Sequence, residues 1–401
     1  MDVLIVGGGL VGQVLALGLD QLGYDVGLVE SKPWKATSSL ADTRAIALSY
    51  GSVKILDFLN IWEKLKPDAT PIDLVHVSEK GGFASCRLDK QALELDYLGQ
   101  VLEIHVLLKN LMELVSQRKN IKIFSPAELD LNSLNSNTQK IIVNQGENNQ
   151  KIPETLEIHA KLIIAADGRE SGIKQALNLS SQTQRFNQIA LVGNIKLKNS
   201  NQNIAYERFT SSGPLALLPI NKNRATFIWV MKPEELEKRE SLGKNNPAEF
   251  LKLLQQEFGY RAGRFEQLLS LQSHELIQSI AEQTYHNNIL LMGNAAHALH
   301  PIAGQGFNLS LKDVGELLNQ IKMSGDLSPE VIQCYLNLRA KDQKELVYFS
   351  SCLAELFTQD FFKFNSGFNS GLKILRGLGL FILEREKFCK KYMAQRLAGI
   401  L

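Results

Sequence analysis

The residues that could do chemistry lie first in a glycine-spaced loop between positions 289 and 313. An apolar run ends at Gly293-Asn294, Gly304 and Gly306 follow, and a helical pattern opens at Asn308. Glycines allow backbone N–H groups to come close to a ligand. A helix that starts behind such a loop offers unpaired donors and a partial positive charge to an anion. The spacing therefore indicates an anion-binding corner, although an ordinary strand–loop–helix corner would have the same pattern.

A second glycine motif stands near the N-terminus, where Gly7, Gly9 and Gly12 form GxGxxG. The apolar segment DVLIV precedes it, a helical pattern follows it, and a second apolar strand ends in Glu30. In a dinucleotide site the first glycine makes the turn, the second admits a pyrophosphate, and the third lets the helix pack on the strand, while the acidic residue binds a ribose. A lone GxGxxG is weak evidence, but this one lies in a complete strand–helix–strand unit and predicts nucleotide binding.

Two further residues could join such a site. Asp167-Gly168 ends a buried strand in KLIIAADGRESGIK, and open α/β sheets bind ligands at the carboxyl ends of their strands. An Asp-Gly turn or a helix N-cap would have the same sequence. Arg44 could reach a phosphate with its planar fork or remain a solvated surface charge.

Composition limits the class of protein. The chain has 401 residues, of which 44% are hydrophobic and 21% charged, which is typical of a globular protein with two or three domains. A net charge of +2 without a basic stripe gives no argument for nucleic-acid binding. The four scattered cysteines predict reduced thiols, with no disulfide framework or zinc site. Because no apolar stretch is long enough to span a membrane and no signal peptide is apparent, we expect a cytoplasmic protein.

The order of the elements predicts an α/β fold class: a Rossmann-like nucleotide-binding domain with an inserted antiparallel-sheet substrate domain and C-terminal helices. The β-rich segments between 186 and 231 have no intervening helices, which indicates a separate antiparallel sheet. A charged helical stretch is predicted over 233–271 and a polar surface hairpin over 132–157. We assign the nucleotide-binding domain to residues 1–75, 98–180 and 280–330, the substrate domain to 76–97 and 181–279, and a C-terminal helical region to 331–401.

Three motifs in this order resemble the FAD-dependent aromatic hydroxylases of the para-hydroxybenzoate hydroxylase fold: GxGxxG with its Glu, Asp-Gly midway, and GNAAHALHPIAGQGFN. The resemblance covers essentially the whole chain. The segments DTRAIALSYGS, VLEIH, GPLALLP and HPIAGQGFN are most similar to the ubiquinone-biosynthesis hydroxylases, in particular to the branch that hydroxylates 2-polyprenyl-6-methoxyphenol. Asn294 replaces the Asp usual in the broad family, and His105 replaces a phosphate-contacting Arg; that branch shares both changes.

The resemblance implies that FAD is the bound nucleotide and that NAD(P)H is its reductant. O₂ would supply an oxygen atom to the ring of a polyprenylated phenol in ubiquinone biosynthesis. The N-terminal motif would hold the ADP half, and the loop before Asn308 would lie against the flavin ring. The implied cofactor-binding residues are Gly7, Gly9, Leu10, Val11, Gly12, Glu30, Ser31, Arg44, Gln100, His105, Leu129, Asp167, Gly168, Asn294, Gly304, Gln305, Gly306, Phe307 and Asn308.

The catalytic candidates are His300 and Pro301, although the flavin would carry most of the chemistry. His300 could orient or deprotonate a phenol, and a structural histidine in a tight loop is the alternative. His297 and His300 lack a third ligand at motif distance, so we predict no metal site.

The segment 361–396 combines aromatic and aliphatic residues with basic ones. This is typical of an amphipathic helix that contacts a membrane surface or a ubiquinone-biosynthesis protein complex, and packing on the protein itself is the alternative. An oligomer is also compatible with the sequence. Two other functions stay open, namely a non-catalytic flavoprotein subunit of a quinone-biosynthesis assembly and another FAD-dependent oxidoreductase on the same fold.

Overall fold

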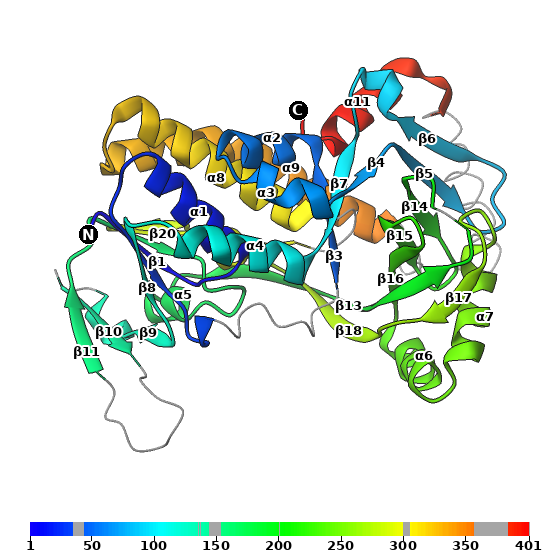
Figure 1. The fold of residues 1–401 in the computed structure, drawn as a ribbon, viewed down its shortest axis with the longest axis horizontal. Coiled ribbons are helices and arrows are strands. Elements are labelled where there is room, and N and C mark those ends of the chain that lie inside the picture. Colours follow the sequence, from blue (N-terminus) through cyan, green and yellow to red (C-terminus); the bar gives the residue numbers. More distant parts are fainter. Residues whose placement is uncertain are drawn as a thin grey trace.

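Two large sheets lie next to each other in the protein, and a layer of long helices covers one of them (Figure 1). The computed structural model describes residues 1–34, 44–134, 136, 138–143, 154–199, 201–299, 305–356 and 384–400, the side chains of 346–356 and 387–389 excepted.

The first sheet has six strands, and all neighbouring pairs are parallel except the pair at one edge. Its apolar strands are buried on both faces, as a parallel sheet requires. Val3 and Ile5 contact one core, while Leu4 between them contacts a second core. In spatial order the strands are β19 (Tyr285–His286), β20 (Ile289–Leu291), β12 (Leu162–Ala165), β1 (Val3–Val6), β2 (Val26–Val29) and β8 (Ile121–Phe124).

Helices cover one face of this sheet and share its larger core. They are α1 (Leu10–Gln21), α2 (Tyr50–Phe58), α3 (Trp62–Leu65), α4 (Ile104–Ser116), α8 (Gln305–Ser324) and α9 (Pro329–Leu356). The other face packs on a three-stranded sheet and a short helix: β9 (Ala127–Leu129), β10 (Gln139–Val143), β11 (Glu154–Ile158) and α5 (Gly172–Ala176). The hairpin predicted over 132–157 is therefore present as β10–β11, but it also buries Ile141 and Ile158 against the parallel sheet.

The second large sheet has nine strands and carries the antiparallel pattern predicted between 186 and 231. Its side chains alternate between two faces. One face packs on α6 (Pro233–Asn245) and α7 (Pro247–Phe258) through residues such as Trp229 and Phe227. The strands are β5 (Leu74–Glu79), β6 (Ser85–Asp89), β13 (Ser181–Leu197), β14 (Ile204–Phe209), β15 (Pro214–Asn221), β16 (Arg224–Met231), β17 (Phe265–Leu268), β18 (Gln272–Ala281) and β21 (His297–Ala298).

The helical prediction over 233–271 is wrong at its C-terminal end. Residues Phe265–Leu268 form β17, an added strand that pairs with β13. This segment becomes a strand because it pairs with residues some 70 positions earlier in the chain. A local sequence pattern does not reveal such pairing.

A small sheet connects the two large ones. It consists of β3 (Ala45–Ser49), β4 (Thr70–Ile72) and β7 (Gly99–Glu103). The last described helix, α11 (Lys387–Leu397), packs near β6 and the 3₁₀ turn Lys90–Leu93 (Figure 1). We keep the three-region division of the chain as a proposal, which is supported by the pairing of β5 and β6 with the nine-stranded sheet and of β20 with the parallel sheet. In the part of the chain that is described, no helix is long and apolar enough to cross a membrane.

Candidate functional site

The GxGxxG turn connects β1 to α1, and each glycine has a separate steric reason to be there. Gly7 has φ +112°, and a Cβ on it would lie 2.3 Å from the carbonyl oxygen of Ala166. A Cβ on Gly12 would lie 2.0 Å from the carbonyl oxygen of Gly7. Only Gly9 has open space beside it, with no atom within 4 Å. The first and third glycines therefore hold the turn together, and the second leaves room for a ligand.

The start of α1 is suited to an anion. Gly9 is its N-cap and provides no side-chain hydrogen bond, and the first turn contains no acidic residue. Leu10 and Val11 open the helix, so their backbone N–H groups belong to the turn whose donors have no partner within the helix. These donors and the helix dipole would favour a pyrophosphate beside Gly9.

Glu30 lies at the end of β2, next to this turn. Its carboxylate accepts hydrogen bonds from Gly8 N (2.8 Å) and Lys32 N (2.9 Å) and is 3.4 Å from Ser31 Oγ. An ionised carboxylate has about four acceptor positions, so free acceptor capacity remains for a ribose diol. The backbone of Ala127 in turn donates to the Glu30 carbonyl at 2.8 Å, which brings the β9 segment with Leu129 alongside the turn. Leu129 itself is buried in the second core.

Asp167 follows β12 at the carboxyl edge of the parallel sheet. Its Oδ1 is buried without a hydrogen-bond partner in the described structure, while Oδ2 lies 3.5 Å from Ile173 N. Burial raises the pKa of this carboxyl. The N-cap of α5 is Ser171 and not Asp167, and Gly168 takes φ +93°. An unsatisfied buried oxygen is costly unless a ligand supplies the missing donor, so Asp167 fits a position against a cofactor hydroxyl.

Arg44, Gln100 and His105 come from the connecting sheet and the start of α4. The Arg44 carbonyl accepts from Ile104 N at 2.8 Å, which ties the strand β3 to the beginning of the helix that carries His105. Gln100 is buried in β7. Arg44 lines the central cavity described below, whereas Gln100 and His105 do not.

The late glycine loop is described only in part. His300, Pro301 and Gly304 lie outside the described residues. Asn294 is exposed, and a Cβ on Gly306 would meet open space. The helix α8 begins at Gln305, three residues before the predicted start. Gln305 is buried, and Phe307 packs against the larger core.

Asn308 makes contacts that the sequence did not suggest. Its Oδ1 accepts from Ser49 N (2.8 Å) and Ser52 Oγ (2.7 Å), and its Nδ2 donates to Ala47 O (2.9 Å). The side chain therefore fixes the first turn of α8 to β3 and α2.

A cavity of about 920 Å³ joins these loops to the inner face of the nine-stranded sheet. Its polar side is formed by Arg44, Asp167, Asn294 and the first turn of α8. The opposite wall is mainly apolar and is covered by the C-terminal helix α11 through Met393, Ala394, Leu397 and Ala398. The apolar wall residues include Val75, Val77, Leu88, Ala190, Val192, Ala205, Phe209, Ala216, Leu218, Ile228, Val230 and Leu276.

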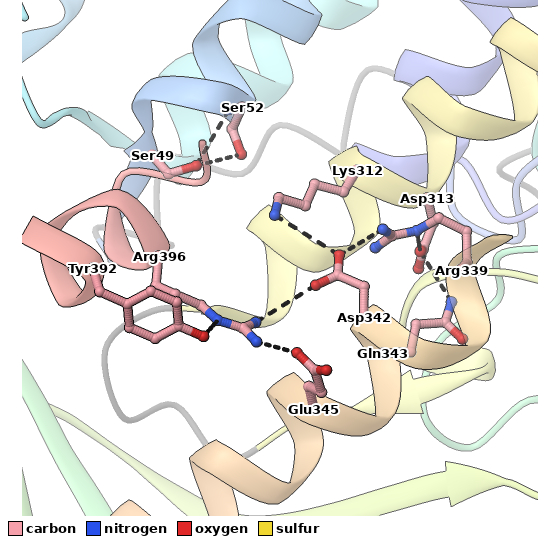
Figure 2. A network of polar contacts seen from close by, with 10 residues as sticks. All are labelled: Ser49, Ser52, Lys312, Asp313, Arg339, Asp342, Gln343, Glu345, Tyr392 and Arg396. Atoms are coloured by element: carbon pink, nitrogen blue, oxygen red, sulfur yellow. Dashed lines mark hydrogen bonds and ion pairs between the residues drawn. The ribbon is translucent and has the colours of Figure 1, made fainter. Parts of the chain in front are cut away.

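A network of ion pairs, buried at Asp313 and Arg339, connects the helices above the cavity (Figure 2). Asp313 of α8 binds Arg339 Nε of α9 at 2.7 Å and His297 Nε2 at 2.5 Å. Arg339 also reaches Asp342 at 2.6 Å, and Arg396 of α11 binds Glu345 and lies 3.7 Å from Asp342. The network thus connects the helix that starts at the glycine loop with the helix that covers the cavity.

His297 belongs to this network through its contact with Asp313. No group of three or more His, Cys, Asp or Glu side chains in the described residues is arranged to hold a metal ion.

Sequence reasoning missed several ionisable groups in the cavity, among them Glu207 of β14. The available signal was the alternation of that strand, because Ala205, Glu207 and Phe209 share one face. The sequence alone does not say which face of the strand lines a cavity.

These features fit an FAD. The open space at Gly9, the uncapped start of α1, the unpartnered oxygen of Asp167 and the open space beside Gly306 lie along the carboxyl edge of the parallel sheet, where such folds bind dinucleotides. The individual contacts of the predicted cofactor residues stay a proposal.

Comparison with known proteins places the chain in a family. A family described as FAD binding domain matches residues 1–350. The chain is 26% identical to ubiquinone hydroxylase UbiL of Rhodospirillum rubrum, over 100% of this chain and 90% of the relative. It is 27% identical to 3-demethoxyubiquinol 3-hydroxylase of Escherichia coli, over 100% of this chain and 98% of the relative.

A solved structure has the same fold. The crystal structure of p-nitrophenol 4-monooxygenase PnpA from Pseudomonas putida matches with a TM-score of 0.76 at 18% identity, over 98% of this chain and 96% of that chain. The fold class, the family and the FAD cofactor predicted from the sequence are thereby confirmed. The chain belongs to the FAD binding domain family and is an FAD-dependent aromatic-ring monooxygenase, similar along its whole length to hydroxylases of ubiquinone biosynthesis.

Proposed function

We propose that this protein uses NAD(P)H and O₂ to hydroxylate the ring of a polyprenylated phenol in ubiquinone biosynthesis, and that its substrate is a 2-polyprenyl-6-methoxyphenol. The names of two whole-length relatives support the pathway. The resemblance of the motif segments, including Asn294 and His105, supports the particular substrate.

The observation that carries this proposal is the two-sided cavity. Its volume of about 920 Å³ is near the upper end of the roughly 300–1,000 Å³ common for small-molecule sites. The polar cofactor side can face a reacting ring, and the apolar sheet face can cover a hydrocarbon chain. Burial of each prenyl carbon would contribute about 0.8 kcal/mol, so even one five-carbon unit would add substantially to the binding free energy.

The residues of the chain bind and position, while the cofactor does the redox work. When bound, the FAD accepts electrons from NAD(P)H and activates O₂. The turn around Gly9 and the start of α8 would offer backbone N–H groups to its anionic parts. The sheet face and α11 would exclude water from the reacting ring. His300 and Pro301 remain predicted catalytic residues outside the described part of the chain.

The test is NAD(P)H oxidation by the purified holoprotein with a series of 2-methoxyphenols that carry no, one or three prenyl units at position 6. We expect bound flavin, a hydroxylated product and a KM that falls as the chain lengthens. Flavin without any phenol-stimulated oxidation would contradict the proposal and favour a non-catalytic subunit.

A variant pair locates the hydrocarbon chain. Ala216→Phe adds a ring to the apolar wall, so it should raise KM for the prenylated phenols about 10-fold or more by removing cavity volume. Ala248→Phe, on the exposed start of α7, is the matched control and should change nothing. An equal effect of both variants would show that the cavity is not where the chain binds.

Contact with a membrane surface or a biosynthetic complex stays part of the proposal. Residues 361–383, which contain most of the aromatic residues behind that prediction, lie outside the described residues. The described part, α11, packs on its own chain. Cosedimentation with vesicles of anionic lipid, with and without residues 361–383, tests the contact.

A further inference from the structure

One carboxyl group stands on the apolar inner face of the nine-stranded sheet. Glu207 lies in the middle of β14, opposite Ala216 on β15 and opposite Val77 on β5. Both neighbours are apolar wall residues of the cavity, and the small Ala216 leaves room beside the carboxyl. Glu207 thus adds a polar group to the sheet side of the cavity that the proposed function gives to the prenylated phenol.

Glu207 has no partner among the described residues. Neither a hydrogen bond nor an ion pair of its side chain is present, and the only influence on its ionisation is burial. Carboxyl groups in apolar surroundings are usually paired, because an isolated buried charge is costly. An unpaired one in a cavity is therefore more readily explained by a ligand than by folding.

Tyr206 of β14 also belongs to the cavity lining, but its ring packs against Phe258 in the core beside α7. The remaining ionisable groups of the cavity wall come from other elements. They are Arg44 before β3, Asp167, Arg169 and Glu170 after β12, and His274 and Glu275 on β18. The strands directly beside β14 contribute none, and neither does α11. On the next strand, β6, the Cys86 thiol lines the cavity, and burial raises its pKa to about 12, so it stays neutral. Among these groups Glu207 alone rises from the centre of the apolar sheet face.

We propose that Glu207 is the general base for the phenol, its carboxylate accepting the proton of the phenolic O–H as the ring is hydroxylated. This inference rests on the proposed function. The phenolic O–H bond breaks, the proton forms an O–H bond with a Glu207 carboxyl oxygen, and the electron pair remains on the phenol oxygen. Delocalisation of that pair enriches the ring carbons that receive the oxygen atom. The proton leaves to water when the product departs, so the step needs no further reactant.

The acidity of Glu207 suits this role. Burial raises its pKa to about 7, and a general base works best with a pKa near the working pH. Below that pH the carboxyl is protonated and cannot accept the phenolic proton, so activity should fall on the acid side. Above it the carboxylate is ready to accept a hydrogen bond from the bound phenol.

The first experiment uses oxidised holoprotein and the probe 2-methoxy-4-nitrophenol, whose phenolate absorbs in the visible range. Bound to the wild-type protein at pH 8, where Glu207 is a carboxylate, the probe should keep its proton and donate a hydrogen bond to Glu207, because a second negative charge beside the carboxylate is unfavourable. In Glu207→Gln that charge is absent, so the bound probe should ionise more readily and its phenolate signal should rise severalfold. Glu207→Asp should give a signal closer to that of the wild type. Glu266→Gln, an exposed residue of β17 paired with Lys196, is the control and should match wild type.

The second experiment measures kcat/KM against pH with a prenylated methoxyphenol. General-base catalysis contributes typically 10²–10⁴-fold, so Glu207→Gln should lose a rate factor of about this size and also lose the acid limb near pH 7. The proposal would be overturned if Glu207→Gln kept the wild-type rate, the wild-type fall of activity on the acid side and the wild-type signal of the bound probe. If wild type oxidises no phenol at all, the proposed function fails, while the probe spectra still decide the role of Glu207.

Discussion

Gly9 and Gly12 lie in one turn, and we predict that alanine at the two positions impairs two different properties of the protein. A Cβ at position 12 would lie 2.0 Å from the Gly7 carbonyl oxygen, which is backbone and cannot rotate away. A Cβ at position 9 would meet nothing within 4 Å. Gly12→Ala should therefore damage the fold, and Gly9→Ala should damage cofactor binding.

The magnitudes follow from these distances. Alanine at position 12 gains about 1 kcal/mol of helix propensity, but backbone overpacking costs about 3 kcal/mol or more, so we expect a net loss of at least 2 kcal/mol. Gly9 has φ −73°, which alanine adopts easily, and a poorer N-cap costs about 1 kcal/mol or less. If the new methyl group removes one charge-assisted hydrogen bond to a phosphate, about 1.5–3 kcal/mol of binding is lost, which weakens FAD about 10- to 100-fold.

The assay separates stability from binding. Thermal unfolding of the FAD-free protein measures the first, and fluorescence quenching during FAD titration measures the second. Gly12→Ala should lower Tm by about 2–3 degrees or more, and Gly9→Ala should leave Tm within about one degree of wild type while weakening FAD binding. Equal Tm losses for the two variants with an unchanged Kd for Gly9→Ala would refute the assignment of open space to a ligand.

Two further predictions concern the helices beside the cavity. Asn308→Ala removes the partner of two buried groups and one half-buried carbonyl, so it should cost about 3 kcal/mol or more of unfolding free energy and weaken FAD binding, as measured by denaturant unfolding and titration. The exposed Asn337→Ala should do neither. Asp313→Asn leaves Arg339 and His297 without their carboxylate and should cost about 3–5 kcal/mol near pH 7. Burial alone would raise the pKa of Asp313, but both partners hold it below its ordinary 3.8. The ion pair is therefore fully stabilising above about pH 4 and is lost below it, so the acid decline of stability should be steeper in wild type than in the variant. An equally steep decline in both would contradict this assignment.

The parts of the fold set by local pattern could be predicted. The GxGxxG turn follows from glycine sterics, and the structure shows why alanine would fail at Gly7 and Gly12. The parallel strands follow from short apolar runs. The antiparallel sheet follows from alternation without intervening helices. Each of these signals is contained in a segment of about 20 residues, so it can be recognised in the sequence without knowledge of the fold.

The parts of the structure that depend on contacts between distant residues could not be predicted from the sequence. Asn308 binds groups on residues 47–52, some 260 positions away, so its motif suggested a ligand contact where the side chain has a packing role. Glu207 is recognisable only when the inner face of β14 is known. Met393 and Ala394 of α11 belong to the segment 361–396, for which contact with a membrane or a partner and packing on the protein itself were both left open. An apolar helix face does not reveal whether it contacts a lipid, a partner or the same chain.

The parallel sheet receives one of its inner strands late. Strand β12 ends at Ala165, and its neighbour β20 begins at Ile289. A ribosome adding about 5–20 residues per second needs roughly 6–25 s to cover that gap. Throughout this time the edge of β12 offers unpaired backbone groups to any other nascent strand. A fragment that stops before β20 should therefore aggregate, and loading of the cofactor should be a late event in the maturation of this protein.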